Sequence, residues 1–297
     1  MEFDLKAHLE EERRVIEAEL RRWLPQPETP TAPLFEAMEY SLMAGGKRLR
    51  PVLMRGAARA VSGDPDLVLP AACAMEFIHT YSLIHDDLPA MDDDDLRRGR
   101  PTCHKVFGEA MAILAGDALL TLAFEIMSAP WPREPALSAR RRATELLARA
   151  AGPLGMVGGQ VGDILFEGRE IDLELLRFIH RRKTGALITA ALVMGGVLAG
   201  AREGDLERLE RYGRAVGHAF QIVDDILDVE GDEEEMGKRV GSDEARGKAT
   251  YPALMGLEES RRRARELVEE AKEAVAPFGA AAAPLAAMAD YIVTRRR

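Results

Sequence analysis

Residues 77–95 decide the fold, and they read Phe77-Ile78-His79-Thr80-Tyr81-Ser82-Leu83-Ile84-His85-Asp86-Asp87-Leu88-Pro89-Ala90-Met91-Asp92-Asp93-Asp94-Asp95. The apolar run that begins near Ala71 predicts a buried helix ending at about Asp86, where the aspartates begin. Carboxylates near the end of an apolar helix are costly unless they are paired, protonated or bound to a metal. The stretch therefore predicts a helical protein with a functional acidic cluster at the end of a core helix.

A second stretch has the same design, and it reads Ala219-Phe220-Gln221-Ile222-Val223-Asp224-Asp225-Ile226-Leu227-Asp228. Side chains four residues apart on a helix project from one face, so Asp224 and Asp228 can coordinate one hard cation together. A lone acidic run is more often a solvated helix face or a cap. Two runs that each follow an apolar helix favour a metal site instead.

Pro89 shapes the first acidic cluster. Asp86 and Asp92 are six residues apart and would diverge on a regular helix, which turns by about 100° per residue. Pro89 lacks an N–H and its ring clashes with the carbonyl of His85, so the helix should bulge or break there. With two residues looped out, Asp86 and Asp92 regain the relation of residues one turn apart. Such hard oxygen ligands suit Mg²⁺ completed by water and substrate phosphates, whereas 93–95 are expected to pair with Arg97 and Arg98.

Outward from these stretches, the chain reads as helix throughout. Aromatic residues make up only 5% of the 297 residues, and alternating strand patterns are missing. Amphipathic spacing predicts an opening helix at 5–24, followed by a proline-rich break. Further helices are expected at about 35–43, 51–61, 110–127, 134–150, 173–199, 205–228 and 258–274. The connections are short and no repeat is found, so residues 1–297 are expected to form a single all-α domain, one bundle of many helices.

Charge and cysteine content limit the partners and the compartment. The net charge of -10 repels nucleic acid and anionic membrane surfaces. Cys73 and Cys103 make neither a disulfide framework nor a zinc cluster, and Met1–Asp4 has no signal-peptide pattern, which fits a cytoplasmic protein. The uncharged run Gly185–Ala201 approaches the length of a membrane span. It is rich in Gly and Ala and bounded by charges, so a buried helix is the preferred interpretation and no span is expected.

Cationic residues accompany the acidic clusters. If magnesium joins the aspartates to a diphosphate, the remaining negative charge requires Lys and Arg, and Arg matches phosphate geometry bidentately. The glycine pair Gly45-Gly46 can also present backbone N–H groups to an anion. Each cation alone is an ordinary surface charge, and only the set carries the prediction. The set consists of Lys47, Arg48, Arg50, Arg97, Arg98, Lys183, Lys238 and Lys248. By contrast, 295–297 are expected to be a solvated tail at a helix C-terminus.

Together these motifs resemble the trans-isoprenyl diphosphate synthase family, and within it the bacterial farnesyl diphosphate synthases, over nearly the whole chain. Residues 45–51 are similar to the family's isopentenyl diphosphate motif. Residues 81–99 look like its first aspartate-rich motif, in the form with two inserted residues. The other signatures are matched by 158–163, 183–185, 220–228, 237–238 and 247–252.

The resemblance implies an all-α isoprenoid-synthase bundle around a central active-site cavity, a homodimer, and three Mg²⁺ ions when diphosphate is bound. The implied metal ligands are Asp86, Asp92 and Asp224. Isopentenyl diphosphate would be held by Gly46, Lys47, Arg50, His79 and Arg98. The allylic diphosphate would be held by Arg97, Lys183, Thr184, Gln221, Lys238 and Lys248. The implied catalytic residues are Asp86, Asp92, Arg97, Lys183, Thr184, Gln221 and Asp224.

The implied reaction condenses isopentenyl diphosphate with dimethylallyl and then geranyl diphosphate, ending at the fifteen-carbon farnesyl diphosphate. The growing tail should run along the apolar helix away from Asp86. A rise of about 1.5 Å per residue places Tyr81 about 7 Å deeper, where a ring could stop elongation. On geometry alone, an ordinary core aromatic is an equally good interpretation. The resemblance favours a floor formed by Tyr81 and Ser82, because short-chain members often carry bulk there.

Four other functions remain as alternatives. A geranylgeranyl diphosphate synthase would have the same site and a deeper pocket. A terpene cyclase would share the aspartates but would not need Lys47, Arg50 and His79 for a second diphosphate. A metal phosphohydrolase built on His85-Asp86 would require more histidine ligands at helical spacing. A non-catalytic partner subunit would show degraded aspartate clusters, and both clusters are intact.

Overall fold

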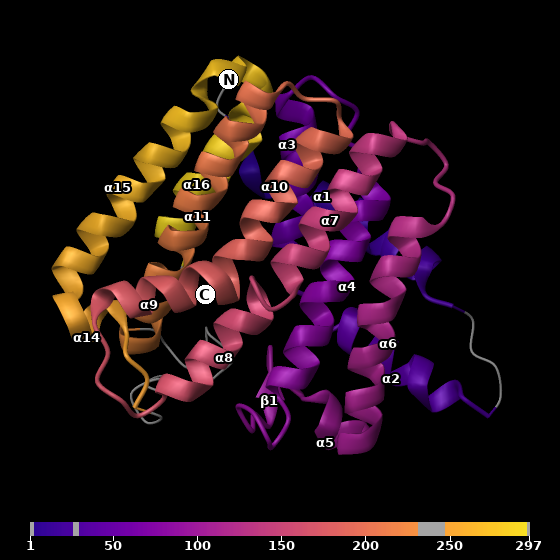
Figure 1. Cartoon of the computed structure of the whole chain (residues 1–297), viewed down its shortest axis with the longest axis vertical. Coiled ribbons are helices and arrows are strands. Elements are labelled where there is room, and N and C mark those ends of the chain that lie inside the picture. The colour runs from indigo at the N-terminus through magenta and orange to yellow at the C-terminus, as the bar shows by residue number, and fades with distance from the viewer. Residues whose placement is uncertain (1–2, 26–29, 231–246, 296–297) are drawn as a thin grey trace.

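The protein is an all-α bundle, as predicted from the sequence (Figure 1). The computed structural model describes residues 3–25, 30–230 and 247–295. Within these ranges the only strands are β1 (Leu96–Arg97) and β2 (Arg100–Pro101), which pair as a short antiparallel hairpin. The sequence patterns did not predict this hairpin. It directly follows the first acidic cluster and therefore belongs to the candidate site.

The predicted helices all appear, with ends shifted by a few residues. Four helices were not predicted, namely α5, α8, α14 and α16. The region expected to be one helix at 173–199 is instead interrupted by a π-helical turn, η1, and a 3₁₀ segment, η2, precedes the last helix. In chain order the helical elements are α1 (Leu5–Trp23), α2 (Ala32–Leu42), α3 (Leu49–Ala60), α4 (Leu69–Asp86), α5 (Cys103–Phe107), α6 (Glu109–Ser128), α7 (Leu137–Ala151), α8 (Met156–Phe166), α9 (Leu173–His180), η1 (Arg181–Gly185), α10 (Ala186–Leu198), α11 (Glu203–Glu230), α14 (Tyr251–Met255), α15 (Leu257–Val275), η2 (Ala276–Ala282) and α16 (Ala283–Thr294).

The uncharged helix α10 lies inside the bundle, packed against α3, α7 and α11 (Figure 1). All but two of its thirteen residues are buried, the exceptions being Ala186 and Thr189. A helix that is apolar on all sides is stable in water only when protein surrounds it, so the buried-helix interpretation of this run is confirmed. By length and composition alone, α6 and the stretch Leu257–Thr294 would suffice to cross a membrane, but both pack against neighbouring helices of the bundle.

Helix α4 carries the first acidic cluster into the middle of the fold. Pro70 stands in its first turn, where a missing N–H costs no hydrogen bond. Most of the helix is buried between α3 on one side and α6 on another. The second cluster is carried by the long helix α11, which packs against α10 and α15. Packing on both sides therefore fixes the two helices that position the aspartates.

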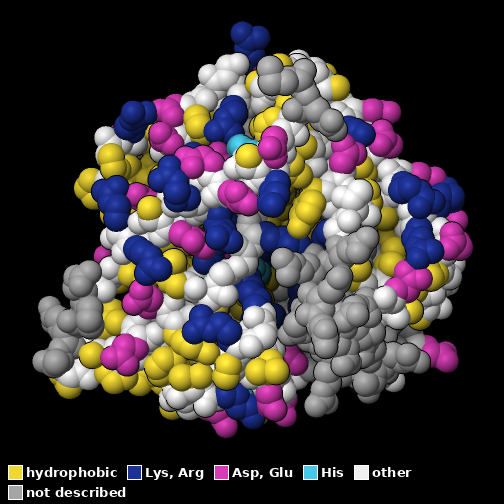
Figure 2. Space-filling view, turned by 180° about the vertical axis from the view of Figure 1, so that it is seen from behind, with side chains coloured by type: hydrophobic (Ala, Val, Ile, Leu, Met, Phe, Trp, Pro, Cys, Tyr) yellow, Lys and Arg dark blue, Asp and Glu magenta, His cyan; other side chains and the backbone are white. Residues whose placement is uncertain are grey.

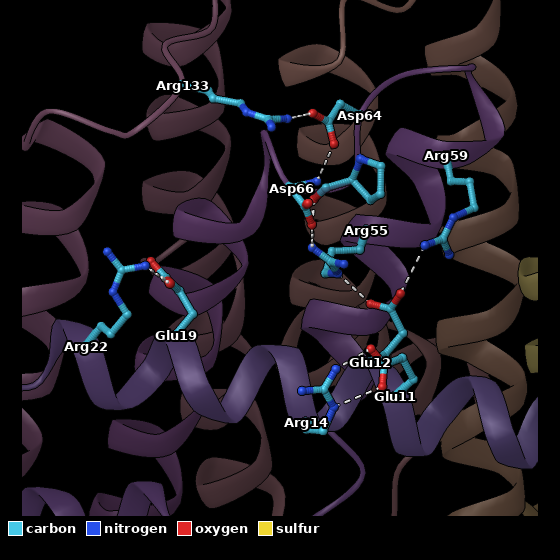
Figure 3. A network of polar contacts seen from close by, with 11 residues as sticks. Glu11, Glu12, Arg14, Glu19, Arg22, Arg55, Arg59, Asp64, Asp66 and Arg133 are labelled. Atoms are coloured by element: carbon cyan, nitrogen blue, oxygen red, sulfur yellow. Dashed lines mark hydrogen bonds and ion pairs between the residues drawn. The ribbon is translucent and has the colours of Figure 1, made fainter.

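A buried ion network fastens α1 to α3 (Figure 3). Arg55 on α3 lies 2.5 Å from Glu12 on α1 and 3.1 Å from Asp66, and Arg59 also reaches Glu12 at 3.1 Å. The side chains of Arg55 and Glu12 are each only 4% exposed. Because water is excluded, loss of Glu12 would leave the buried Arg55 charge offset only by the exposed Asp66 carboxylate.

We expect Glu12→Ala to lower the free energy of unfolding by about 3 kcal/mol, the lower end of the usual cost of breaking a buried pair, because Asp66 still lies beside Arg55. The measurement is urea denaturation followed by circular dichroism, at a fixed protein concentration. Glu11→Ala is the matched control, because Glu11 pairs with Arg14 on the exposed side of the same helix. Equal urea midpoints for Glu12→Ala and Glu11→Ala would show that the network does not hold α1.

Candidate active site

The first acidic cluster has the geometry predicted from Pro89. Helix α4 ends at Asp86, and the chain then loops so that the Asp92 N–H donates to the Asp86 carbonyl at 2.8 Å. That hydrogen bond normally joins residues four apart on a helix, so the predicted one-turn relation of the two aspartates is confirmed. Burial raises the pKa of Asp86 to about 6, against the opposing effect of Lys183. A carboxylate in this setting gains from a nearby cation.

Arg97 extends from β1 to a carboxylate that the sequence reasoning did not single out. Its Nε donates to Asp87 Oδ1 at 2.6 Å, and its guanidinium lies 3.5 Å from Asp94. Asp87 is buried, and its position directly after Asp86 was the available signal. The expected pairing with the arginines thus holds for Asp94. The expected pairing is wrong for Asp95. Its carboxylate lies 2.6 Å from the Lys105 ammonium, because the hairpin turns Asp95 toward α5.

The glycine pair before α3 receives Arg98. A Cβ at Gly46 would lie 2.5 Å from Arg98 Cζ, so the guanidinium rests on bare backbone that only glycine leaves free. Arg98 also donates to the Gly45 carbonyl. Both glycines have positive φ, which glycine adopts without strain. The structure therefore brings together Gly46 and Arg98, two residues predicted for the same anion site.

Arg50 and His79 lie beside Arg98. Burial, with a contribution from Arg98 and against the opposing effect of Glu76, lowers the pKa of Arg50 to about 10. Burial also places the pKa of His79 well below its ordinary value, with Arg50 and Arg98 adding to the effect, so His79 is neutral. The Nε of Arg50 is buried and has no hydrogen-bond partner within the described chain. Clustered cations with an unsatisfied donor fit an anionic ligand.

The two remaining cations of this motif have different surroundings. Lys47 is exposed, and its ammonium lies 5.2 Å from the centre of the Tyr291 ring. Arg48 was expected to face the anion, and this prediction is wrong. Its guanidinium is buried, pairs with Glu76 at 2.8 Å and donates to the Leu42 carbonyl at 2.8 Å. The left-handed backbone at Arg48 turns the side chain inward, where it fixes the loop.

The predicted lysines meet at α8. Lys183 lies in the π-helical turn η1, and its Nζ is 2.6 Å from Asp163 Oδ2. Lys248 reaches the same oxygen at 3.2 Å and Asp92 Oδ1 at 3.5 Å. One ionic chain thus links the first acidic cluster to η1. Lys238 lies outside the described residues. Single π-turns inside helices occur frequently at functional sites.

Thr184 and Gln221 are also brought together. The Thr184 hydroxyl donates to Gln221 Oε1 at 2.8 Å, and the Gln221 amide donates to Asp225 at 3.3 Å. Asp225 is buried and accepts the backbone N–H of Tyr251 at 2.9 Å. It therefore anchors the first residue of α14, three residues after Lys248. Sequence reasoning gave Asp225 no separate role, although its place within the second acidic cluster was visible.

The second acidic cluster presents Asp224 rather than a matched pair. The Asp224 side chain is 37% exposed, whereas Asp228 is 2% exposed. Arg295 lies 2.5 Å from Asp224, donates to the Phe220 carbonyl at 3.0 Å and stacks over the Phe220 ring at 4.0 Å. The expectation of a solvated tail is thus wrong for Arg295, because the face of the Phe220 ring and the Asp224 carboxylate both bind its guanidinium. Arg296 and Arg297 lie outside the described residues.

We expect Arg295→Gln to tighten binding of Mn²⁺, in the absence of substrate, by about fivefold. The reason is that a partly exposed ion pair contributes about 1 kcal/mol, and this competition with Asp224 would be removed. Titration followed by electron paramagnetic resonance measures the affinity. Arg263→Gln removes an arginine paired with Glu266, away from Asp224, and serves as the control. Equal affinities in the two variants would contradict competition at Asp224.

Tyr81 and Ser82 occupy different sides of α4. Tyr81 is 7% exposed, and its ring contacts the His85 ring edge-on at 5.8 Å. His85 in turn packs against α6, with its Nε2 3.1 Å from the Ile113 carbonyl. Ser82 stands four residues before Asp86 and therefore on the Asp86 face, where its hydroxyl donates to the His79 carbonyl at 2.8 Å.

The donor set fits magnesium bound together with phosphate. Among the described residues, no three His, Cys, Asp or Glu side chains converge on one metal position. Asp86, Asp92 and Asp224 therefore offer hard oxygens that would need water and ligand oxygens to complete an octahedron, as Mg²⁺ prefers. Figure 2 shows a hollow in one face of the molecule bordered by Lys and Arg side chains. Acidic groups and cations together suit a diphosphate and its metal ions.

Comparison with known proteins gives a consistent result. A sequence model described as polyprenyl synthetase matches residues 31–283. The farnesyl diphosphate synthase of Geobacillus stearothermophilus is 47% identical over 294 residues, 99% of each chain. The geranylgeranyl diphosphate synthase of Cyanophora paradoxa is also 47% identical over 294 residues, covering 99% of this chain and 97% of the relative. The solved structure of an FPP/GFPP synthase from Zymomonas mobilis has a TM-score of 0.88 at 40% identity, covering 97% of this chain and 98% of that one.

Proposed function

Because this chain belongs to the polyprenyl synthetase family and is a prenyltransferase, we propose that it is a magnesium-dependent farnesyl diphosphate synthase. The substrates would be isopentenyl diphosphate, the homoallylic partner, and an allylic diphosphate, first dimethylallyl and then geranyl. The site residues keep the roles implied by the sequence. Magnesium would be held by Asp86, Asp92 and Asp224 together with the substrate.

The observation that carries the proposal is the presence of two separate cation clusters beside the aspartates. Arg50 and Arg98 surround neutral His79 on one side. Lys183 and Lys248 meet at Asp163 on the other, in contact with Asp92. A condensation of two diphosphates needs two anion sites, whereas a terpene cyclase needs one. The buried, unsatisfied Nε of Arg50 supports a ligand at the first cluster.

Chemistry at the second cluster would begin with departure of the allylic diphosphate. Bound magnesium supplies positive charge that stabilises the leaving group. Lys183 and Lys248 donate to the same developing charge, which favours breaking of the C–O bond. The allylic cation left behind lies near the π-turn, where the Thr184 and Gln221 dipoles can stabilise it, and apolar walls exclude water.

Carbon–carbon bond formation would follow from the position of the second substrate. Arg50 and Arg98 hold the diphosphate of isopentenyl diphosphate so that its double bond attacks the cation. Loss of one proton from the adduct then gives the new allylic double bond. We assign that proton to the released diphosphate, as the family resemblance implies, because burial and the neighbouring arginines lower the pKa of His79 and make it a poor base.

The proposed product is farnesyl diphosphate, with geranylgeranyl diphosphate as the second candidate. The second candidate is included because relatives of equal identity bear both names. The buried Tyr81 ring, close to Asp86 on α4, favours the shorter product.

We further propose that the enzyme is a cytoplasmic homodimer that uses the face formed by α5 and α6. Three large apolar side chains there are exposed by 44–53%, namely Val106, Ile113 and Leu114. A second copy covering this face would remove them from water. Size-exclusion chromatography with light scattering should give twice the mass of 32.7 kDa.

Incubation with dimethylallyl diphosphate, isopentenyl diphosphate and Mg²⁺ tests the proposed function. Mass spectrometry should find farnesyl diphosphate as the main product and none when Mg²⁺ is removed with a chelator. Geranylgeranyl diphosphate as the main product would select the second candidate. A cyclised hydrocarbon, or no product, would reject prenyl chain elongation.

A further inference from the structure

Lys183 and Lys248 share a single carboxylate oxygen. The two ammonium groups lie 2.6 Å and 3.2 Å from Asp163 Oδ2, so they stand within two hydrogen-bond lengths of each other. The side chains of Asp163, Lys183 and Lys248 are exposed by only 19%, 25% and 15%. Salt and water screen such a partly buried cluster less than a surface pair.

Backbone contacts tie helix α8, which carries Asp163, to both lysine segments. A Cβ at Gly159 would lie 2.1 Å from the backbone nitrogen of Lys183, so this glycine lets α8 press directly on η1. Beyond the other end of α8, the Gly168 N–H donates to the Gly247 carbonyl at 3.2 Å. Asp163 stands one turn after Gly159 on the same face. The backbone therefore holds Asp163 between the two lysines independently of their charges.

Two like charges this close repel each other, and Asp163 supplies the opposite charge. The neighbouring lysines hold the pKa of Asp163 below its ordinary value although burial alone would raise it, so the carboxyl is ionised. The other carboxylate in contact is Asp92, 3.5 Å from Lys248. A lysine ammonium has three donors, so each can keep its bond to Asp163 and still donate to a ligand.

We propose that Asp163 is the positioning residue of the allylic diphosphate site. It holds Lys183 and Lys248 side by side, so that both ammonium groups donate to one diphosphate without first overcoming their mutual repulsion. This role rests on the proposed function for the identity of the ligand. Asp163 itself touches the lysines and acts on the substrate only through them.

Asp163→Asn tests the role, because it keeps the size of the side chain and removes its charge. We expect KM for dimethylallyl diphosphate to rise about tenfold, because a neutral amide accepts weaker hydrogen bonds from the two ammonium groups and no longer offsets their repulsion. KM for isopentenyl diphosphate should stay within about twofold, since its cations do not contact Asp163. Asp163→Glu should recover most of the loss. Asp290→Asn is the control, because it makes the same change at an exposed pair with Lys272.

Limited trypsin digestion tests the same role without using enzymatic activity. Cleavage between Lys248 and Ala249, followed by mass spectrometry, should be at least about threefold faster in Asp163→Asn than in wild type or Asp290→Asn, because cleavage follows the open population. Unchanged cleavage, an equal rise of both KM values, or no recovery with Glu would each overturn the proposal. Wild-type protein that makes no condensation product would reject the proposed function and leave the digestion result as the test of Asp163.

Discussion

Asp86→Ala is expected to lower kcat on the order of 1,000-fold, the upper range for loss of one group that stabilises transition-state charge. Asp86 ends α4, and its backbone carbonyl holds Asp92 one turn away, so Asp86→Ala removes one of the two carboxylates on this wall of the proposed metal site and leaves the backbone bond in place. The helix should persist, because burial of an uncompensated carboxylate contributes little to stability. Initial rates at saturating Mg²⁺ and both substrates measure the loss.

Asp224→Ala should reduce kcat to a similar extent, because Asp224 is the accessible member of the opposite cluster. Asp95→Ala is the matched control. It removes a carboxylate from the same loop as Asp92, but one that pairs with Lys105 on the surface. Circular dichroism should show equal helicity in all three variants. Near-normal turnover in either Asp86→Ala or Asp224→Ala would refute the assignment of these residues to the metal site.

The first acidic loop could be predicted because its cause is local. Pro89 cannot continue a helix, and the number of residues up to Asp92 fixes how much chain must loop out. The bundle was predictable for the same kind of reason, since apolar residues at helical spacing mark each long helix. Helix α8 escaped prediction because Gly158, Gly159 and Gly162 lower its intrinsic helix propensity. It forms through packing on η1, which no local pattern shows.

Two of the errors concern side chains whose partners lie far away in the sequence. Arg48 and Arg50 are two residues apart and look equivalent, yet Arg48 is buried against Glu76. Arg295 looks like part of a basic tail, but the Phe220 ring and Asp224 lie within its reach. These contacts depend on how α4, α11 and α16 pack, so residue type and spacing could not reveal them.

The π-turn η1 shows a different limit. Residues 173–199 have an uninterrupted helical pattern, and no Pro marks a break. The turn widens where Gly185 faces Gly217, since a Cβ added at Gly217 would lie 3.0 Å from the Gly185 Cα. On another side, α8 packs directly against the backbone of Lys183. Tertiary packing therefore selects the irregular turn that carries Lys183 and Thr184. The sequence predicted site roles for both residues but not the irregular backbone that positions them.

Tyr81→Ala is expected to change the main product from fifteen to twenty carbons. The ring lies on the α6 side of α4, against His85, while Ser82 is on the Asp86 face one turn from the metal site. If the proposed tail runs from the Asp86 face toward the α6 side of α4, it passes the small Ser82 side chain and then meets the aromatic ring. Removing the ring opens space that an additional five-carbon unit can fill. Chromatography of the products, after conversion to alcohols, measures the chain length.

Two further variants separate ring size from hydroxyl chemistry. Tyr81→Phe keeps the ring, so it should still give farnesyl diphosphate. Ser82→Phe places a ring one turn from Asp86, so it should shorten the product to ten carbons. If all three results are obtained, a side chain on α4 blocks the growing tail, and the position of that side chain along the helix sets the product length. Farnesyl diphosphate as the sole product of Tyr81→Ala would instead make Tyr81 an ordinary core residue, and the length of the tail would then have to be limited elsewhere.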